Sequence, residues 1–550
     1  LFRELLGIAE GSSLACGSKH LLLFNRSCEP WRRRRDDSVC KAVESFGVAV
    51  ESAMANVLYE PWDLQAIEHW QRWRARVRAE EARSRGRMKD AASLSGTPKD
   101  LEHISGFGSY RFFHHALEEL GDPKRPVAAV TSLPGCPPVQ SLRLDDLGYG
   151  RTQGHGFLSA TRQCRDGVRG AAAGSDVSPD DWAAELRKWW SFGEAAAWRR
   201  LDEFLAGVLA PGDFEGRRRL LADHRGTSEL SPYIRFGELS ARTVYWAARR
   251  RTERTSQCLF SESASSGRPA KANSTFLRRF VWRDLAYWFL WEFPSLPTMS
   301  MRTQYEDEIW AGTKAQLRRW QSGRTGFPLV DAAMRQLWAV GWMPNYMRHI
   351  VAQTLIEYLD ITWKDGLAWF DWTLVDSDVA INSIMWQNGG HSGPDQWEFV
   401  LHPVHAAKTC DPDGSYVRRW LPCLAGLPAE FIHRPWEAPV RLMGCGYPSP
   451  ILMDLDEARR AHARHVIEVR RRHPEMVART GHEWMRLPGR KGLLAKVVTR
   501  DEFRAETVDF IFYQGPRRGA APASRRPVGD ASGDALADAV RSHEERGPGL

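Results

Sequence analysis

A tryptophan-rich stretch from Pro179 to about Trp436 constrains the fold more than any other part of this chain. Within it, Val330, Met334 and Leu337 recur at i, i+4 and i+7, and apolar residues keep a helical spacing from Met347 through Leu355. This period lines up apolar side chains along one face of a helix. Most of the 24 tryptophans are expected in the core, although so many indoles also allow base stacking or electron transfer. The pattern predicts a large all-helical domain.

Strand and helix signals alternate before this stretch. Residues 20–24 (HLLLF) are typical of a buried strand, Asp36 can cap a helix through Phe46, and a second strand starts at 48–50. Such alternation favours a parallel α/β layer. The chain begins at Leu1 without Met, so we expect it to be a fragment or an incompletely predicted gene product.

Composition excludes some classes of protein. No apolar run approaches the roughly 18 residues of a membrane span, and the nine scattered cysteines form no Cys-x-x-Cys pair. We therefore expect a soluble, intracellular protein without a membrane partner, a disulfide framework or a zinc site of the cysteine type. The compartment, whether nucleus, chloroplast or cytoplasm, is left open. The formal net charge of +8 is compatible with a polyanionic partner such as DNA.

The first motif with chemical potential is Gly226-Thr-Ser-Glu-Leu-Ser-Pro232, just before a helical stretch. Hydroxyl groups and backbone N–H groups at a helix start can bind an anion such as phosphate. Serine and threonine are also favoured there simply as helix caps. Taken alone, the motif favours the cap.

The second motif is Trp342-Met-Pro-Asn-Tyr-Met-Arg-His349. Asn345, Arg348 and His349 stand at i, i+3 and i+4, so a helix would direct all three to one side. They could line a pocket, or they could form an ordinary solvated face.

The third motif begins at Asp376, where Asp378, Asn382 and Trp386 follow at i, i+4 and i+8. A carboxylate near Arg348 would hold the guanidinium by a charge-assisted hydrogen bond, and an amide beside a redox-active ring could exchange hydrogen bonds with it. The alternative is a helix whose start carries an acidic cap. A metal site is disfavoured because few further ligands lie nearby in the sequence.

In this order, the motifs resemble the FAD-binding domain of photolyases and cryptochromes. The resemblance is strong over residues 180–440, and residues 20–60 with LYEPWD (58–63) look like the second half of the family's N-terminal α/β domain. The matching runs are TSELSPYIRFGELS (227–240), VWRDLAYW (281–288), TGFPLVDAAMRQLWAVGWMPNYMR (325–348), LVDSDVAIN (374–382) and DPDGSYVRRWLP (411–422).

The resemblance implies a truncated Rossmann-like α/β domain followed by a large all-α FAD-binding domain. The family's antenna chromophore, a folate or a deazaflavin, would lack the first strand of its domain here. The expected boundaries are 1–118 for the partial α/β domain, 119–178 for a connecting segment, 179–440 for the helical domain, 441–515 for a C-terminal extension and 516–550 for a disordered tail.

The resemblance also implies a set of FAD-binding residues. Arg348 should pair with Asp376, Asp378 should hold the adenosine or ribityl side, and Asn382 should face flavin N5. The remaining residues expected around the cofactor are Thr227, Ser228, Leu230 and Ser231 at the pyrophosphate, together with Arg283 and Asn345.

Trp386, Trp363 and Trp310 match the three positions of the family's electron-transfer chain from the flavin to the surface. Each of them could equally be a core residue, because the chain has many tryptophans. Their joint spacing favours the electron-transfer role.

Repair and light reception share this fold, so the fold does not separate them. Photolyases that repair cyclobutane dimers have Trp, Glu, Trp and Met where this chain has Phe276, Arg279, Asn388 and His349; of the repair pattern, only Trp282 and Asn345 match. The (6-4) photolyases need two histidines, and only His349 is present. Arginine at 279 donates hydrogen bonds where glutamate accepts them.

These substitutions favour a blue-light photoreceptor on the cryptochrome side. The run MWQNGGHSG (385–393) resembles the plant photolyase-like group. A receptor would have a protein partner that binds in a light-dependent manner. Two alternatives remain: a photolyase with an unusual substrate pocket that acts on DNA, and a flavin-binding scaffold without a light function.

Overall fold

The computed structural model describes most of the helical stretch and part of the N-terminal region. The chain divides into two units, residues 1–54 with 126–188 and residues 55–125 with 189–550. Most of the expected connecting segment and all of the expected tail lie outside the described residues. The described ranges are 21–64, 103–105, 110–127, 183–222, 224–262, 274–395, 397, 399–439, 446–487 and 494–504.

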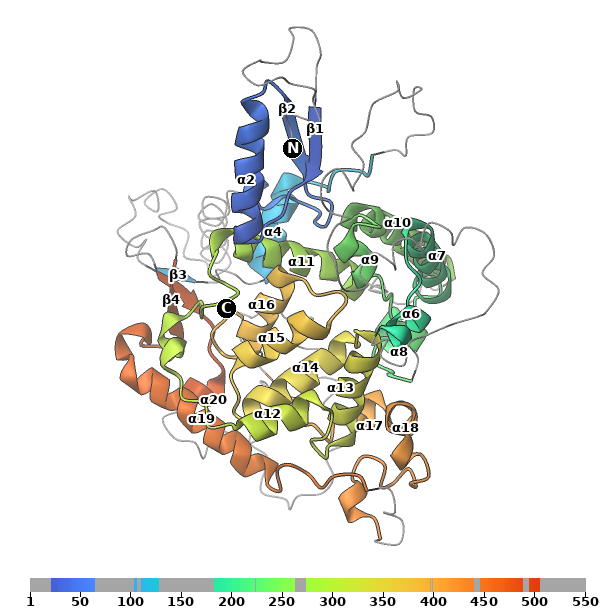
Figure 1. Ribbon diagram of the computed structural model, residues 1–550, viewed down its shortest axis with the longest axis vertical. Helices are drawn as coiled ribbons and strands as arrows, with labels where there is room; N and C mark the ends of the chain where they lie inside the picture. The colour runs from blue at the N-terminus through green and yellow to red at the C-terminus, as the bar shows by residue number, and fades with distance from the viewer. Residues whose placement is uncertain are drawn as a thin grey trace, which may run out of the picture. The chain divides into compact units, whose positions relative to one another are not determined.

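The first unit contains a strand–helix–strand motif (Figure 1). The strands β1 (Leu21–Asn25) and β2 (Ala49–Ala53) pair in parallel, and α2 (Pro30–Glu44) connects them. The predicted alternation of strand and helix is confirmed for these elements. A Rossmann-like domain is not confirmed, because the sheet described in this unit has only two strands.

The start of α2 differs from the prediction. Glu29 is the N-cap residue and Pro30 lies in the first turn, so Asp36 lies inside the helix, where it pairs with Arg35 at 2.6 Å. Proline has a fixed φ and no N–H group, and both properties suit the first turn of a helix. The proline therefore sets the helix start upstream of the expected aspartate cap.

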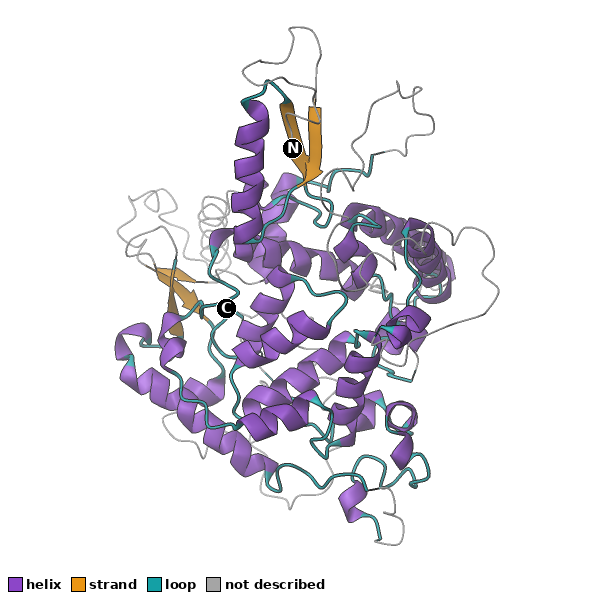
Figure 2. Cartoon of the chain, in the orientation of Figure 1, coloured by secondary structure: helices purple, strands orange, loops and turns teal. Residues whose placement is uncertain are grey.

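The second unit is mainly helical, as Figure 2 shows for its described residues. Among its described residues the first α-helix is α4 (Tyr110–Leu120), and α6 (Ala184–Trp189) crosses the boundary between the units. Two π-helical segments, η3 (Leu205–Leu209) and η6 (Thr354–Tyr358), extend α7 and α14. The other helices are α7 (Glu194–Phe204), α8 (Phe214–Arg217), α9 (Ser231–Phe236), α10 (Ala241–Glu262), α11 (Ser274–Glu292), α12 (Lys314–Gln321), α13 (Pro328–Val340), α14 (Asn345–Gln353), α15 (Trp363–Thr373), α16 (Val379–Gly389), α17 (Ala407–Cys410), α18 (Ser415–Trp420), α19 (Leu455–Arg472) and α20 (Asp501–Arg504).

Local sequence explains where the central helices begin and end. Pro328 opens α13, and Gly341 ends it with a left-handed φ of 66° that glycine adopts without steric cost. The side chain of Thr362 caps α15, and that of Asp378 caps α16 by accepting the Ile381 N–H at 3.2 Å. These signals hold α13 to α16 at fixed lengths around the core.

The core of the second unit forms where α13, α14, α15 and α16 pack together. On α14, Met347, Ile350 and Val351 have an exposed fraction of 0%, which confirms the predicted apolar face. Trp320 and Trp363 are also fully or almost fully buried, at 0% and 2%. These two indoles therefore contribute to the packing of the core.

The segment after residue 445 does not form a separate body. Helix α19 packs against η6, and its residues share a small core with Tyr305. A buried ion pair of 3.1 Å joins Glu483 to Arg302. The strand order of the small sheet is β3-β5-β4, with β3 (His103–Ser105) parallel to β5 (Leu494–Val497) and β4 (Glu483–Arg486) antiparallel to it.

The N-terminal residues of the second unit are also held by hydrogen bonds. Asp284 on α11 accepts the backbone N–H groups of Leu58 and Tyr59, each at 3.0 Å. Residues 55–64 therefore belong with the helices of the second unit, which begins at residue 55. Among the described helices, none combines the length and the apolar character that crossing a bilayer requires.

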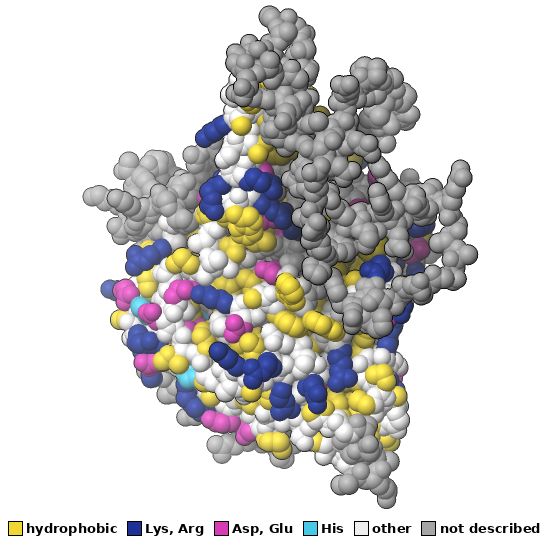
Figure 3. Space-filling view, in the orientation of Figure 1, with side chains coloured by type: hydrophobic (Ala, Val, Ile, Leu, Met, Phe, Trp, Pro, Cys, Tyr) yellow, Lys and Arg dark blue, Asp and Glu magenta, His cyan; other side chains and the backbone are white. Residues whose placement is uncertain are grey.

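The surface carries charges of both signs. On the face in Figure 3, Lys and Arg side chains lie in separate groups, with acidic and apolar side chains between them. No continuous basic surface covers the described part of this face.

Candidate functional site

A pocket of about 400 Å³ opens among α9, α11, α14 and α16 in the second unit. The structure brings all of the predicted cofactor-binding residues together in its wall, although they are spread over more than 150 positions of the chain. They are Thr227, Ser228, Leu230, Ser231, Arg283, Asn345, Arg348, Asp376, Asp378 and Asn382. Trp386 also lines the pocket, whereas Trp363 and Trp310 lie outside it.

The residues of the loop before α9 line the pocket, and their side chains do not cap the helix. Leu230 is the N-cap residue and no side chain caps α9, so the helix-cap interpretation of the motif is wrong. Glu229 has a left-handed φ of 51°, and Ser231 Oγ accepts the Trp342 Nε1–H at 3.3 Å. Thr227 Oγ1 is buried and has no hydrogen-bond partner among the described residues.

An ion pair forms a second part of the wall. Arg348 donates from Nη2 to Asp376 Oδ2 at 2.8 Å and from Nε to the Met343 carbonyl at 3.1 Å. The Asp376 side chain is 3% exposed, and its other oxygen, Oδ1, is buried with no partner among the described residues. The pair therefore presents a fixed guanidinium and one available acceptor to the pocket.

Asp378 is tied into the protein by three donors. Its carboxylate accepts hydrogen bonds from Arg283 at 2.9 Å, from the Tyr287 hydroxyl at 2.7 Å and from the Ile381 N–H at 3.2 Å. This network joins the start of α16 to α11 across the pocket. The acidic cap and the pocket-lining role thus coexist in one residue.

The amide of Asn382 is oriented by two acceptors. Its Nδ2 donates to Asp371 Oδ1 at 3.0 Å and to Ser377 Oγ at 3.2 Å. Both amide hydrogens are used in this way, so the group that remains for a ligand is the carbonyl oxygen, an acceptor.

Trp386 and Trp363 belong to neighbouring helices that interlock through two glycines. A Cβ atom at Gly366 would lie 2.2 Å from Trp386 Cη2, and one at Gly390 would lie 2.6 Å from Trp363 Cδ1. Each indole therefore fills the space that a glycine leaves on the opposite segment. Phe370 packs edge-on against Trp386 at a ring-centroid distance of 5.0 Å.

Trp310 is the least buried of the three predicted electron-transfer residues. Its indole stacks on the imidazole of His462 from α19, with ring centroids 5.8 Å apart and planes 29° apart. The C-terminal segment thus contacts the outermost of these tryptophans.

Two residues of the pocket that sequence reasoning did not single out carry polar or aromatic groups of functional interest, Trp397 and Glu229. Trp397 lies beside His349, with ring centroids 4.4 Å apart, and Glu229 lies in the loop before α9. Burial raises the pKa of Glu229 to about 7, although Arg200, 3.7 Å away, acts in the opposite direction. Trp397 lies four residues after the GGHSG run (389–393), and Glu229 lies inside the run 226–232, so both are close in sequence to motifs that line the pocket.

The residues present fit FAD. Two buried oxygen atoms, Thr227 Oγ1 and Asp376 Oδ1, lack partners among the described residues, and unpaired buried polar atoms mark places where a ligand completes the hydrogen bonding. Arg348 supplies positive charge for an anionic group, and Leu285, Ala286 and Phe289 supply an apolar wall for an aromatic ring.

Comparison with known proteins supports this conclusion. The family described as the FAD binding domain of DNA photolyase matches residues 276–467. A deoxyribodipyrimidine photo-lyase of Agrobacterium fabrum is 37% identical over 281 residues, which is 50% of this chain and 55% of that protein. Cryptochrome-2 of Arabidopsis thaliana is 35% identical over 296 residues, 52% of this chain and 47% of that protein. The chain spans about half the length of these curated relatives.

Solved structures agree. A bacterial class III photolyase from Agrobacterium tumefaciens is similar with a TM-score of 0.58 and 28% identity, over 82% of this chain and 80% of that one. A cryptochrome of Synechocystis is similar in fold, with a TM-score of 0.55 and 20% identity over 80% of this chain and 78% of that one. Together with the pocket, these matches show that the chain carries an FAD-binding domain similar to that of photolyases and cryptochromes.

Proposed function

We propose that this protein is a blue-light flavoprotein of the cryptochrome type, and that Trp386 and Trp363 pass electrons to its cofactor. The observation that carries the proposal is that one pocket gathers all the residues expected around FAD and an indole, combined with changed side chains at the positions expected to grip a pyrimidine dimer. FAD supplies the light absorption and accepts the electron when bound. The remaining work falls to residues of the chain.

Trp386 is suited to be the first donor because it lines the pocket and is only 3% exposed. Because burial excludes water from the indole, the positive charge that remains on it after electron transfer is not neutralised at once by solvent. Trp363, 2% exposed, lies against the end of the same helix through Gly390 and takes the next position. Trp310 is the last of the three tryptophans in the proposed electron-transfer series. It is partly exposed and contacts His462, so it can exchange electrons with molecules outside the protein.

Asn382 and Arg348 tune the pocket. The carbonyl oxygen of Asn382 can accept a hydrogen bond from a protonated ring nitrogen, so it favours the reduced form of a flavin. Arg348 stays in place because Asp376 holds its guanidinium, and its positive charge favours an added negative charge nearby. Both side chains therefore stabilise the product of light-driven reduction.

The dimer-gripping positions are changed in structure as well as in sequence. Phe276 lines the pocket with a phenyl ring in place of the larger indole, and it packs among Phe204 and Phe214 at ring-centroid distances of 4.9 and 5.5 Å. Asn388 is 3% exposed, and its Oδ1 accepts the Asp395 N–H at 3.2 Å. Arg279 lines the pocket but only donates hydrogen bonds, whereas a pyrimidine N–H needs an acceptor.

A second candidate, a photolyase with an unusual substrate pocket, is favoured by two other indoles. Trp282 and Trp397 both line the pocket, and aromatic side chains hold flipped-out bases by stacking. Arg278 and Arg279 line the same pocket and would attract DNA phosphates.

A repair assay tests the proposal. FAD-loaded, chemically reduced protein is illuminated with blue light in the presence of a cyclobutane-dimer oligonucleotide, single- or double-stranded, with a dark sample and an active photolyase as controls. We expect no repair above the dark sample. Clear turnover would overturn the receptor assignment and establish the photolyase, and the Trp282→Ala and Trp397→Ala variants would then show which indole holds the base.

A further inference from the structure

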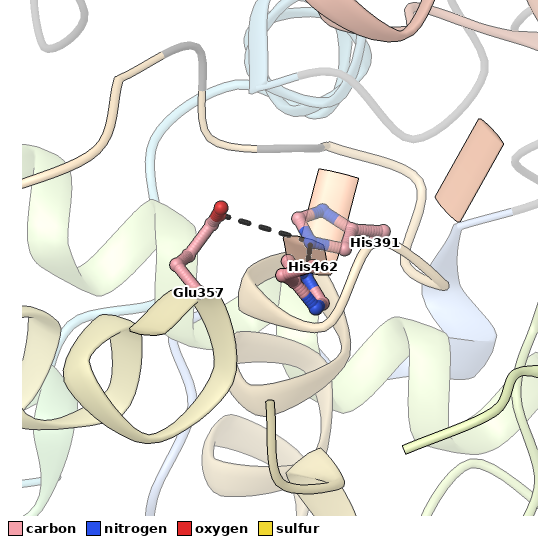
Figure 4. A group of neighbouring side chains, drawn as sticks. All are labelled: Glu357, His391 and His462. Atoms are coloured by element: carbon pink, nitrogen blue, oxygen red, sulfur yellow. Dashed lines mark hydrogen bonds and ion pairs between the residues drawn. The ribbon is translucent and has the colours of Figure 1, made fainter. Parts of the chain in front are cut away.

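Three buried side chains from distant parts of the chain converge outside the FAD pocket (Figure 4). Glu357 comes from η6, His391 from the turn after α16 and His462 from α19. Their exposed fractions are 1%, 1% and 0%. They lie where helix α19 packs on the FAD-binding domain, and only His462, which stacks on Trp310, enters the proposed function.

Their ligating atoms are close enough to share one ion. The Nε2 atoms of His391 and His462 lie 2.9 Å apart, and Glu357 Oε1 lies 3.7 Å from His391 Nε2. All three ligating atoms lie within 4.8 Å of one another. Around a tetrahedral ion with bonds of about 2.0–2.2 Å, two ligating atoms are roughly 3.3 Å apart. The side chains would reach this spacing if their ligating atoms moved by a few tenths of an ångström, and by at most somewhat over 1 Å for the third atom pair.

The surroundings orient these ligands. His462 Nδ1 lies 2.7 Å from Asp360 Oδ1. In this arrangement the Nδ1–H group donates a hydrogen bond to the carboxylate, and the Nε2 lone pair faces Glu357 and His391. Glu357 accepts hydrogen bonds from Arg500 at 2.6 and 3.1 Å, which fix the position of its carboxylate. Arg500 is in turn paired with Glu502, so its own charge is balanced.

We propose that Glu357, His391 and His462 bind one zinc ion, with water as the fourth ligand. Two imidazole nitrogens and one carboxylate oxygen suit Zn²⁺, whereas Mg²⁺ and Ca²⁺ prefer oxygen ligands only. The ion joins α19 to η6 and to the end of α16, and it therefore fixes the C-terminal segment on the FAD-binding domain. Since Zn²⁺ has no redox chemistry, it does this beside Trp310 without exchanging electrons with it.

Zinc binding to the whole, FAD-loaded chain tests the proposal. Protein without an affinity tag is treated with a chelator, and ZnCl₂ is then titrated by calorimetry, with bound metal counted by elemental analysis. We expect about one zinc per chain and a rise in Tm of about 2–5 °C at a hundredfold excess over Kd, with no such rise for MgCl₂. Less than about one-tenth of a zinc per chain at saturating ZnCl₂ would overturn the proposal.

Variants locate the site. His391→Gln and His462→Gln should each weaken zinc binding at least about 100-fold, and Asp360→Asn about 10–100-fold. His473→Gln, at the C-cap of the same helix α19, and His402→Gln, in the separate stacked pair with His405, should bind zinc like the wild type. Unchanged affinity in His391→Gln and His462→Gln would overturn the assignment. Should these variants fail to retain FAD, zinc-edge X-ray absorption of the wild type decides: two imidazoles in the first shell support the site, and their absence overturns it.

Discussion

Gly366 offers a sharp test of how Trp386 is seated. It lies within α15, where replacing glycine by alanine normally stabilises a helix by up to about 1 kcal/mol. Here the new Cβ would lie 2.2 Å from Trp386 Cη2 and 2.8 Å from Leu355 Cδ2. Ordinary contact begins at 3.4 Å, so the indole would have to move by about 1.2 Å.

The indole has little room to do so. Phe370 and Trp320 pack edge-on against Trp386 at ring-centroid distances of 5.0 and 6.4 Å, and Trp386 is 3% exposed. Overpacking a well-filled core costs about 1–3 kcal/mol. This cost exceeds the gain in helix propensity, and we expect Gly366→Ala to lower the free energy of unfolding by about 1–2 kcal/mol.

Denaturant unfolding followed by circular dichroism measures this change on the FAD-loaded protein. Gly216→Ala is the matched control: Gly216 is an exposed helical glycine of α8, and a Cβ there meets no atom within 4 Å. It should leave stability unchanged or raise it by up to about 1 kcal/mol. If Gly366→Ala is as stable as Gly216→Ala and keeps the wild-type rate of flavin photoreduction, the described contact between α15 and Trp386 is wrong.

Two further predictions concern charges of the pocket. Arg348→Ala leaves the buried Asp376 carboxylate without its partner at 2.8 Å, so it should lower the free energy of unfolding by about 3–5 kcal/mol and cause loss of FAD on gel filtration. The double variant with Asp376→Asn should recover part of this stability. No recovery would contradict the pairing. Burial raises the pKa of Glu229 from 4.5 to about 7, so its neutral form stabilises the fold fully below about pH 4.5, and this contribution is lost as the pH rises to 7. Unfolding at pH 5 and pH 8 should therefore show a smaller difference for Glu229→Gln than for the wild type, and equal differences would refute the pKa shift.

The helices of the FAD-binding domain could be predicted because their signals are local. The apolar period of α13 and α14, the proline that opens α13 and the aspartate that caps α16 all lie within a few residues of the feature they determine. The predicted start of α2 was wrong because two local signals, Pro30 and Asp36, both fit a helix start. Only the structure shows that Pro30 lies in the first turn.

The pocket was predictable as a set of residues but not as a geometry. The order of the motifs indicated which side chains meet, and the structure gathers them in one wall. The sequence did not reveal that the Asp378 carboxylate would be shared by Arg283, Tyr287 and the α16 cap, because one aspartate fits either role equally well. Which of these residues contact FAD directly stays a prediction.

Contacts between distant segments were out of reach. Strand β3 pairs with β5 although nearly 400 residues separate them, and a short strand carries no signal for its partner. His391 and His462 are 71 residues apart, and no spacing rule connects them. Long-range burial of charge, as at Glu357 and Arg500, likewise appears only after folding brings α19 and α20 onto the helical core.

Light-driven reduction of the bound flavin tests the central claim most directly. Oxidised, FAD-loaded wild type, Trp386→Phe and Trp372→Phe are illuminated with blue light and an external reductant, and loss of the oxidised flavin absorption is followed over time. Trp372 is 81% exposed on α15 and lies outside the pocket, so it serves as the control. We predict that Trp386→Phe retains FAD but is reduced at least about tenfold more slowly, a barrier increase of about 1.4 kcal/mol, whereas Trp372→Phe matches the wild type. Reduction of Trp386→Phe at the wild-type rate would contradict the account.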